Sequence, residues 1–108
     1  MDRYDYSFRI RDFLKANNVG KENGIKAVYL ANTFNISTRT LRSLKQTIAQ
    51  NIDARVGSTT RHGYFYAGDD VEIMYFANEY MSRATEYWKM ADAYKVELAN
   101  RNQMKLVV

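Results

Sequence analysis

The sequence predicts a mainly α-helical protein in which three short helices and a β-hairpin precede a long C-terminal helix. Three observations support this prediction. Apolar residues recur at helical spacing in three segments of the first half, the spacing becomes that of β-strands over residues 56–66, and neither Gly nor Pro follows Gly68. We therefore expect one unit over residues 1–68 and a long self-association helix over residues 69–108.

The first expected helix covers about residues 5–17. Its apolar residues recur on one face: Tyr6, Ile10, Phe13 and Leu14. The following Asn and Gly residues tolerate the left-handed backbone found at helix ends, so we expect the helix to end there.

Two further helices follow at a short distance from each other. The second is expected over about residues 24–33, with three of its side chains buried: Ile25, Leu30 and either Val28 or Tyr29. The third is expected to begin after Ser37, a favourable N-cap residue, and to bury Leu41, Leu44 and Ile48.

Residues 56–59 and 64–66 are rich in β-branched and aromatic side chains, which predicts a β-hairpin. Residues 60–63 join the two strands, and Gly63 can adopt the positive φ of a tight turn. Tyr64 and Tyr66 share one face of their strand, opposite Phe65. We expect at least one of these faces to lie in the core.

The last helix is expected to begin at Asp69 or Asp70, to reach about Asn102 and to be about 50 Å long. Its apolar residues alternate in steps of four and three, which is the heptad pattern of a coiled coil. The first turns, with Ile73, are expected to cover the N-terminal core. The remainder is expected to bind a second copy, parallel or antiparallel, through Tyr80, Ala84, Tyr87, Trp88, Ala91, Tyr94 and Leu98.

The spacing between the second and third helices is typical of a helix-turn-helix. Ala31 is small where the two helices would cross, and Asn35 can adopt the left-handed backbone usually taken by Gly in this turn. Leu41 and Leu44 would anchor the following helix to the core. The alternative is a structural helical hairpin with the same spacing.

Burial of these leucines leaves six polar, non-acidic side chains facing outward on the third helix. They are Thr38, Arg39, Arg42, Ser43, Lys45 and Gln46. Arg can bind guanine through two hydrogen bonds and Gln can bind adenine, so this face suits a DNA major groove. Ser37 and the helix N-terminus are expected to bind a phosphate through backbone N–H groups.

The hairpin continues this basic surface, because no acidic residue lies between Asp53 and Asp69. The candidate contact residues are Arg55, which precedes the hairpin, and Thr59, Thr60, Arg61 and His62 at its tip. Such a hairpin can act as a wing that contacts the DNA backbone or the minor groove. These contacts would position the protein on DNA without specifying sequence.

Charge is distributed unevenly along the chain. The 108 residues include 16 Lys and Arg against 12 Asp and Glu. Residues 1–66 have a net charge of +6 and residues 67–108 of −2, which indicates a polyanionic partner for the first part. The absence of Cys excludes disulfides and thiolate sites, and a single His excludes a multi-histidine metal centre. With no long apolar segment, we expect a cytoplasmic protein without a membrane span.

No catalytic, metal or cofactor site is expected, and the chain is not predicted to be an enzyme. The segment from Gly63 to Gly68 has the glycine spacing of a phosphate-binding loop, but Asp69 and Asp70 occupy the positions that need Lys and Ser or Thr. Helix capping explains these two carboxylates without a metal. His62 has no nucleophile near it in sequence, so a contact at the hairpin tip is the simpler role.

The chain resembles the small winged helix-turn-helix proteins encoded by phages and prophages of Gram-positive bacteria. The resemblance covers roughly residues 8–90. It depends on residues 19–26, on Leu30-Ala31 through Leu41-Arg42, on Gly63-Tyr64-Phe65-Tyr66-Ala67 and on Met81-Ser82-Arg83, whereas residues 52–56 depart from the pattern. It implies a DNA-binding scaffold of three helices and a wing, followed by a helix that pairs two chains.

The leading hypothesis is a sequence-specific double-stranded DNA-binding protein, a phage or mobile-element transcriptional regulator that acts as a dimer or higher oligomer. One alternative is a protein-binding module, a phage-encoded inhibitor or adaptor of host machinery. That module would use Tyr87, Trp88, Met90 and Tyr94 as anchors, because such residues are enriched in interfaces. A further alternative is a DNA-packaging or recombination accessory protein, which would form an oligomer larger than a tetramer.

Overall fold

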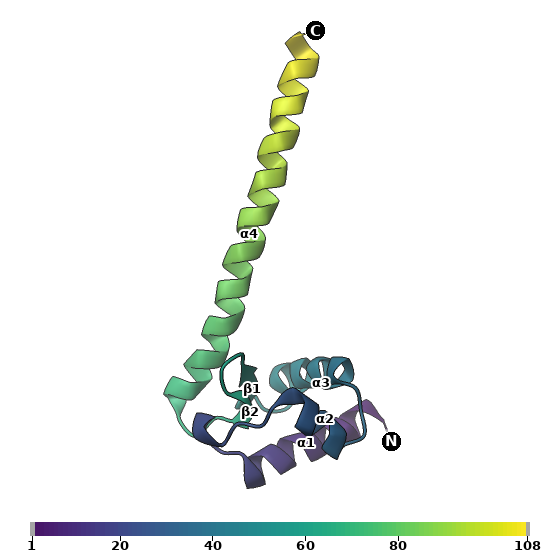
Figure 1. The fold of residues 1–108 in the computed structure, drawn as a ribbon, viewed down its shortest axis with the longest axis vertical. Coiled ribbons are helices and arrows are strands. Elements are labelled where there is room, and N and C mark those ends of the chain that lie inside the picture. The colour runs from purple at the N-terminus through teal and green to yellow at the C-terminus, as the bar shows by residue number, and fades with distance from the viewer. Residues whose placement is uncertain (1, 108) are drawn as a thin grey trace. The chain divides into compact units, whose positions relative to one another are not determined.

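The computed structural model describes residues 2–107, and the side chains of residues 2–102. In chain order the elements are α1 (Arg3–Asn17), a 3-10 turn η1 (Lys21–Asn23), α2 (Ala27–Thr33), α3 (Thr38–Asn51), β1 (Val56–Thr59), β2 (Gly63–Tyr66) and α4 (Asp70–Val107) (Figure 1). The prediction of a mainly helical chain with one antiparallel hairpin and a long last helix is confirmed. Met1 and Val108, at the ends of the two predicted units, lie outside the described residues.

The chain divides into two units, Met1–Ala77 and Asn78–Val108. This boundary falls later than the one expected after residue 68, because the first turns of α4 belong to the first unit. There Phe76 is buried, and its ring centroid lies 4.8 Å from that of Phe65. Ile73 packs beside them, as expected from the sequence.

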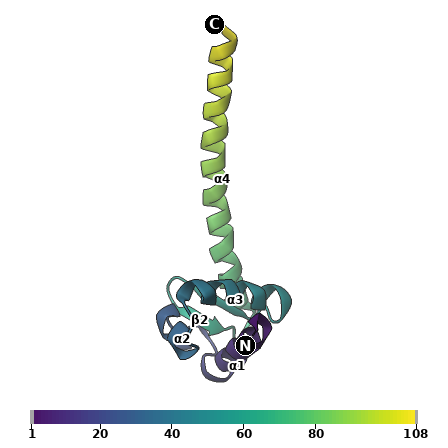
Figure 2. The ribbon, with the colours of Figure 1, turned by 90° about the vertical axis from the view of Figure 1, so that its right-hand side faces the viewer.

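The core of the first unit lies where α1, α2 and α3 gather around the hairpin (Figures 1 and 2). Its largest fully buried aliphatic side chains come from all three helices and from β1: Ile10, Leu14, Leu30, Leu41, Leu44, Ile48 and Val56. Tyr64 and Tyr66 join this cluster, while Phe65 on the opposite face of β2 packs with Ala67 and Phe76. Both faces of β2 are therefore buried.

Helix α2 begins at Ala27, later than the sequence suggested. The backbone N–H and C=O of Ile25 each form a 2.8 Å hydrogen bond with Tyr64, so this segment pairs with β2 and is not helical. The expectation that either Val28 or Tyr29 is buried is wrong, since both are exposed. Leu30 is buried as expected, and with the helix starting at residue 27 it is Ala31 that faces the core beside it.

The turn between α2 and α3 confirms the sequence analysis. Asn35 adopts a left-handed backbone with φ of 53°, and the next amide, of Ile36, donates to the carbonyl of Ala31 at 3.0 Å. Ser37 caps α3, because its Oγ accepts a hydrogen bond from the amide of Thr40 at 3.0 Å. The turn is thus fixed by Asn35 at its beginning and by the Ser37 cap at its end, and together they orient α3.

The hairpin has the expected strands. Val56 pairs with Tyr66 at the base, and Thr59 pairs with Gly63 next to the turn. Gly63 has φ of 78°, and a Cβ there would lie 2.5 Å from the carbonyl oxygen of Ile25. Glycine is therefore required both by the turn and by the close approach of the preceding segment.

The second unit consists of the part of α4 from Asn78 onward. Its large apolar side chains are exposed, with 74 % of Tyr87, 66 % of Trp88 and 65 % of Tyr94 accessible to solvent. Within residues 2–107, no helix combines the length and the apolar character needed to cross a membrane. The exposed residues therefore form an apolar stripe on a charged helix.

Candidate nucleic-acid interface

The outward face of α3 is polar and contains no acidic residue. Of the six side chains predicted to face outward, Thr38, Arg39, Arg42 and Gln46 are exposed and Ser43 is half-buried. In the part of the chain that the structure describes, the side chains of Arg39 and Arg42 form no hydrogen bond or ion pair with another residue. Their guanidinium groups are available to an external acceptor.

Lys45 does not face outward, and this prediction is wrong. Only 6 % of the residue is exposed. Its Nζ donates a 2.8 Å hydrogen bond to Ser58 Oγ of β1 and lies 5.4 Å from the centre of the Tyr64 ring. The hairpin covers this side of α3, so Lys45 links the helix to the hairpin.

Ser43 is also held by a residue that sequence reasoning did not single out. Arg3 of α1 donates from Nη2 to the Ser43 carbonyl oxygen at 2.9 Å and to its Oγ at 2.7 Å. The same guanidinium donates to Thr47 Oγ1, at 3.0 Å from Nε and 2.8 Å from Nη2. Arg3 therefore fixes one side of α3 against α1, and no sequence pattern indicated this contact.

At the hairpin tip the structure separates the predicted contact residues into two groups. Thr60 and Arg61 are exposed. Thr59 is buried, and its Oγ1 accepts a 3.0 Å hydrogen bond from the amide of His62 while lying 3.1 Å from His62 Nδ1. The half-buried His62 ring also meets Phe65 edge-on, so Thr59 and His62 stabilise the turn and Arg61 is the exposed cation.

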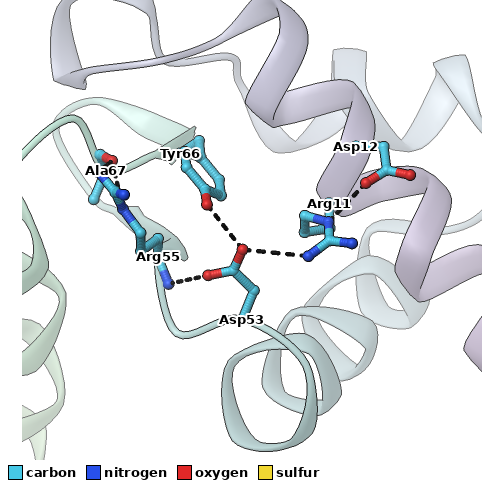
Figure 3. A network of polar contacts seen from close by, with 6 residues as sticks. All are labelled: Arg11, Asp12, Asp53, Arg55, Tyr66 and Ala67. Carbon is cyan, nitrogen blue, oxygen red and sulfur yellow. Dashed lines mark hydrogen bonds and ion pairs between the residues drawn. The ribbon is translucent and has the colours of Figure 1, made fainter.

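Arg55 lies at the base of the hairpin. Its Nε and Nη2 donate to the carbonyl oxygen of Ala67 at 3.2 and 2.9 Å, and its guanidinium lies 5.2 Å from the centre of the Tyr66 ring (Figure 3). These contacts hold the Arg55 side chain against the end of β2. Arg55 remains exposed, at the end of the hairpin opposite to the tip residues.

Arg55 belongs to a polar network centred on Asp53 (Figure 3). The Asp53 carboxylate accepts hydrogen bonds from the Arg55 amide at 3.0 Å and from the Tyr66 hydroxyl at 2.9 Å, and it pairs with Arg11 at 3.4 Å. The network joins α1, the segment after α3 and β2. Asp53 lies in the segment between α3 and β1, so the network fixes the hairpin relative to α3.

The network shifts two pKa values. Burial alone would raise the pKa of Asp53, but the hydrogen bonds from Arg55, Tyr66 and Arg11 outweigh burial and lower it. Burial raises the pKa of Tyr66, and its hydrogen bond to Asp53 raises it further. The charged Asp53 and the neutral Tyr66 are therefore the forms that the fold stabilises.

A cleft of about 540 Å³ lies between the hairpin tip and the segment before α2. Its lining includes the cationic residues Lys21, Lys26 and Arg61, together with His62 and a single acidic residue, Glu22. Sequence reasoning missed Lys21 and Lys26. Their position between Gly20 and Ala27, in a segment with two glycines that reaches the hairpin, is the signal that could have indicated them.

Glu72 holds the Lys21 segment in place. The residue is 8 % exposed, and its carboxylate accepts hydrogen bonds from the backbone amides of Lys21 at 2.6 Å and Gly68 at 2.7 Å. Asp69 caps α4, as predicted from the sequence, because its carboxylate accepts a 2.9 Å hydrogen bond from the amide of Glu72. Glu72 therefore positions the backbone at Lys21, beside the cleft, and its own side chain is not part of the cleft lining.

The described residues contain no group of three or more His, Asp or Glu side chains that could hold a metal ion. Comparisons of the chain with protein-family models, with curated proteins and with solved structures found no match. The function of the chain must therefore be inferred from the geometry of α3, the hairpin and the cleft.

Proposed function

We propose that this chain is a sequence-specific double-stranded DNA-binding protein, in which α3 enters the major groove. One observation supports this proposal above the others. The exposed face of α3 presents Arg39, Arg42 and Gln46, and the helix contains no acidic residue. The left-handed backbone of Asn35 orients the start of this helix. Arg and Gln are side chains that distinguish bases in the major groove through paired hydrogen bonds.

The arrangement around α3 supports a winged helix-turn-helix. The segment at Ile25 pairs with β2, and β2 pairs with β1, so a short third strand-like segment borders the hairpin. In a winged helix such a sheet supports the wing beside the recognition helix. Arg61 at the tip is then placed to contact the DNA backbone.

The cleft adds a second cationic contact to this proposal. The cleft is lined by three cationic residues, Lys21, Lys26 and Arg61, and by one acidic residue, Glu22. Contacts between such side chains and phosphates position a protein on DNA and make affinity dependent on salt. We assign the cleft residues to phosphate contact and the α3 residues to base contact.

The experiment is binding to a pool of random duplexes at increasing salt, followed by measurements on the enriched sequence. Arg39→Ala or Arg42→Ala should weaken binding to that sequence by about 1–3 kcal/mol and relax its specificity. Arg61→Ala or Lys26→Ala should weaken binding to all duplexes alike. Lys89→Ala, which removes the same charge from α4, is the matched control and should change little.

A pool without enriched sequences, or equal losses for Arg42→Ala and Lys89→Ala, would reject sequence-specific binding. The regulatory role and the phage origin rest on the resemblance of residues 8–90 alone. A regulator of this kind acts as a dimer, and its two-fold symmetry predicts related half-sites in the enriched sequence. The exposed apolar stripe of α4 is the surface for dimerisation.

A further inference from the structure

The apolar stripe of α4 alternates small and large residues within the second unit. The heptad positions from residue 80 onward are Tyr80, Ala84, Tyr87, Ala91, Tyr94 and Leu98, and the larger side chains among them are all exposed. We propose that this stripe binds the same stripe of a second copy running in the opposite direction. The inference specifies, and rests on, the dimerisation in the proposed function.

Side-chain volume distinguishes the two directions. In a parallel, in-register pair each position meets itself, so layers of two alanines alternate with layers of two tyrosines. One separation between the helices cannot suit both, because it leaves cavities at the alanines or overlap at the tyrosines. In an antiparallel pair each heptad position meets the other kind, so every alanine can face a tyrosine, and two large side chains meet only where Leu98 ends the stripe.

One antiparallel register pairs all six positions. In it Ala84 faces Tyr94 of the second copy, Tyr87 faces Ala91, and Tyr80 faces Leu98, with each layer repeated by symmetry. Each tyrosine ring lies across a small partner or at the end of the stripe, and its hydroxyl can reach solvent beside the helix pair. The polar atoms of the tyrosines therefore need not be buried.

Charge selects the same register. Arg83 and Glu97 lie next to the stripe on the same side of α4, and this register places Arg83 of each copy opposite Glu97 of the other. Within one helix Arg83 already pairs with Glu79 at 3.6 Å, and Glu97 with Arg101 at 3.0 Å. Each side of the dimer would thus bring Glu79 and Arg83 of one copy next to Glu97 of the second copy.

A shift by one heptad keeps the volumes matched but loses the charges. It places Ala84 opposite Tyr87, which again joins a small to a large side chain. The same shift places Arg83 opposite Met90 and Glu97 opposite Phe76, so neither charge gains a partner of opposite sign. Volume therefore favours the antiparallel direction, and charge complementarity determines the register.

The flanking apolar residues fit this register as well. Trp88 and Met90 lie on opposite sides of the stripe, and near the two-fold axis each would meet its own counterpart in the second copy. Both are exposed, with 66 % of Trp88 and 53 % of Met90 accessible. An apolar centre with charged pairs toward the ends is the usual anatomy of a protein interface.

Direction can be tested by disulfide formation, because the chain contains no Cys. A protein with Ala84→Cys mixed with one carrying Tyr94→Cys should form the mixed disulfide as the main product. Neither variant alone should form one, since its two sulfur-bearing residues would lie about 15 Å apart along the helix pair, beyond the reach of a disulfide. Both variants change exposed residues of the second unit.

Three outcomes would overturn the inference. A disulfide formed by Ala84→Cys alone would indicate a parallel pair, and a mixed disulfide of Ala84→Cys with Tyr87→Cys would indicate the shifted register. A monomeric mass at every protein concentration would show that no second copy covers the stripe, and would leave it to another protein. All three are measured without DNA, so they are separate from the outcome for Arg39 and Arg42.

The charge pairing is tested by exchange between Arg83→Glu and Glu97→Arg chains. Each variant pairs like charges with itself, whereas the heterodimer restores both pairs of opposite charge. Changes within each helix are the same in homodimers and heterodimers and cancel. We expect the ratio of heterodimer to homodimers to exceed its value under random exchange by about five-fold, and the random ratio would overturn the assigned register.

Discussion

The two units differ in where their large apolar side chains lie, although both contain helices with an apolar face. In α3, Leu44 is 2 % exposed because it packs in the core cluster of the first unit, whereas in the second unit Leu98 is 60 % exposed. Apolar residues recur at helical spacing in both segments. The comparison shows that periodicity predicts an apolar face, but the rest of the chain decides whether that face is buried within one molecule.

Matched leucine truncations provide the largest test of this comparison. Leu44→Ala should lower the free energy of unfolding of the first unit by about 2–5 kcal/mol, because it leaves a cavity in the core. Leu98→Ala removes the same atoms from an exposed site and should leave that free energy unchanged while weakening self-association. Hydrogen exchange of the α1 and α3 amides, measured in dilute protein, reports on the first unit alone.

Equal losses of protection in the two leucine variants would contradict the difference between the units. Dilution matters because dimerisation would stabilise the folded chain by mass action. The comparison is therefore made at concentrations where the protein is monomeric. The concentration dependence of the mass then measures the effect on pairing separately.

The next effect sharpens the boundary between the units. A Cβ at Gly57 would lie 2.5 Å from atoms of the Phe76 ring, so Gly57→Ala should lower the free energy of unfolding by about 1–3 kcal/mol. In a Phe76→Ala background the added methyl finds space, and its cost should disappear. Denaturant unfolding of the four proteins gives this coupling energy, and a cost that persists without the ring would place Phe76 elsewhere.

A smaller effect depends on pH and concerns only the first unit. The folded pKa of Asp53 lies below its ordinary value of 3.8, so its charged form contributes stability above about pH 4, and this is lost as the pH falls through the folded pKa. Asp53→Asn should therefore lower stability by about 1–2 kcal/mol at pH 7 and much less at low pH.

The matched control is Asp12→Asn, because Asp12 is exposed and its carboxylate pairs with the side chain of its neighbour Arg11 at 2.7 Å. Unfolding curves of both variants between about pH 2 and pH 7, a range that spans the ordinary carboxyl pKa values, give the free energies of unfolding to be compared. An Asp53→Asn effect that did not change with pH would show that the network depends on shape and not on the charge.

The smallest expected effect is at the turn before α3. Asn35→Ala should cost about 1 kcal/mol because alanine is disfavoured at φ of 53°, whereas Asn35→Gly should be close to neutral. Thermal unfolding of the two variants checks this. If alanine and glycine were equivalent, the left-handed backbone would not be what orients α3.

Several features of the first unit could be predicted from sequence because their causes are local. Ser37 caps α3 through its own side chain, Asn35 and Gly63 supply positive φ, and the spacing of Leu41, Leu44 and Ile48 defines the buried face. Each depends on residues within a turn or two along the chain. The positions of the base-facing candidates Arg39, Arg42 and Gln46 follow from that buried face.

Other features were decided by contacts between distant segments. Lys45 was expected on the surface, yet the hairpin covers it, and pairing of Ile25 with Tyr64 shortens α2. The contacts of Arg3 with Ser43 and of Glu72 with the Lys21 amide join residues more than 35 positions apart. No local pattern contains this information, because each of these polar groups acquires its partner only when the chain is folded.

The sequence by itself thus determined the helices, the hairpin, the turn before α3 and the small–large alternation of α4, since these depend on local conformational preference and periodicity. Only the tertiary structure decided which cations remain exposed. It buries Lys45, ties the exposed Arg55 to the carbonyl oxygen of Ala67, and leaves Arg39, Arg42 and Arg61 exposed. The physical reason is that a charged side chain is buried only where the fold supplies hydrogen-bond partners for it.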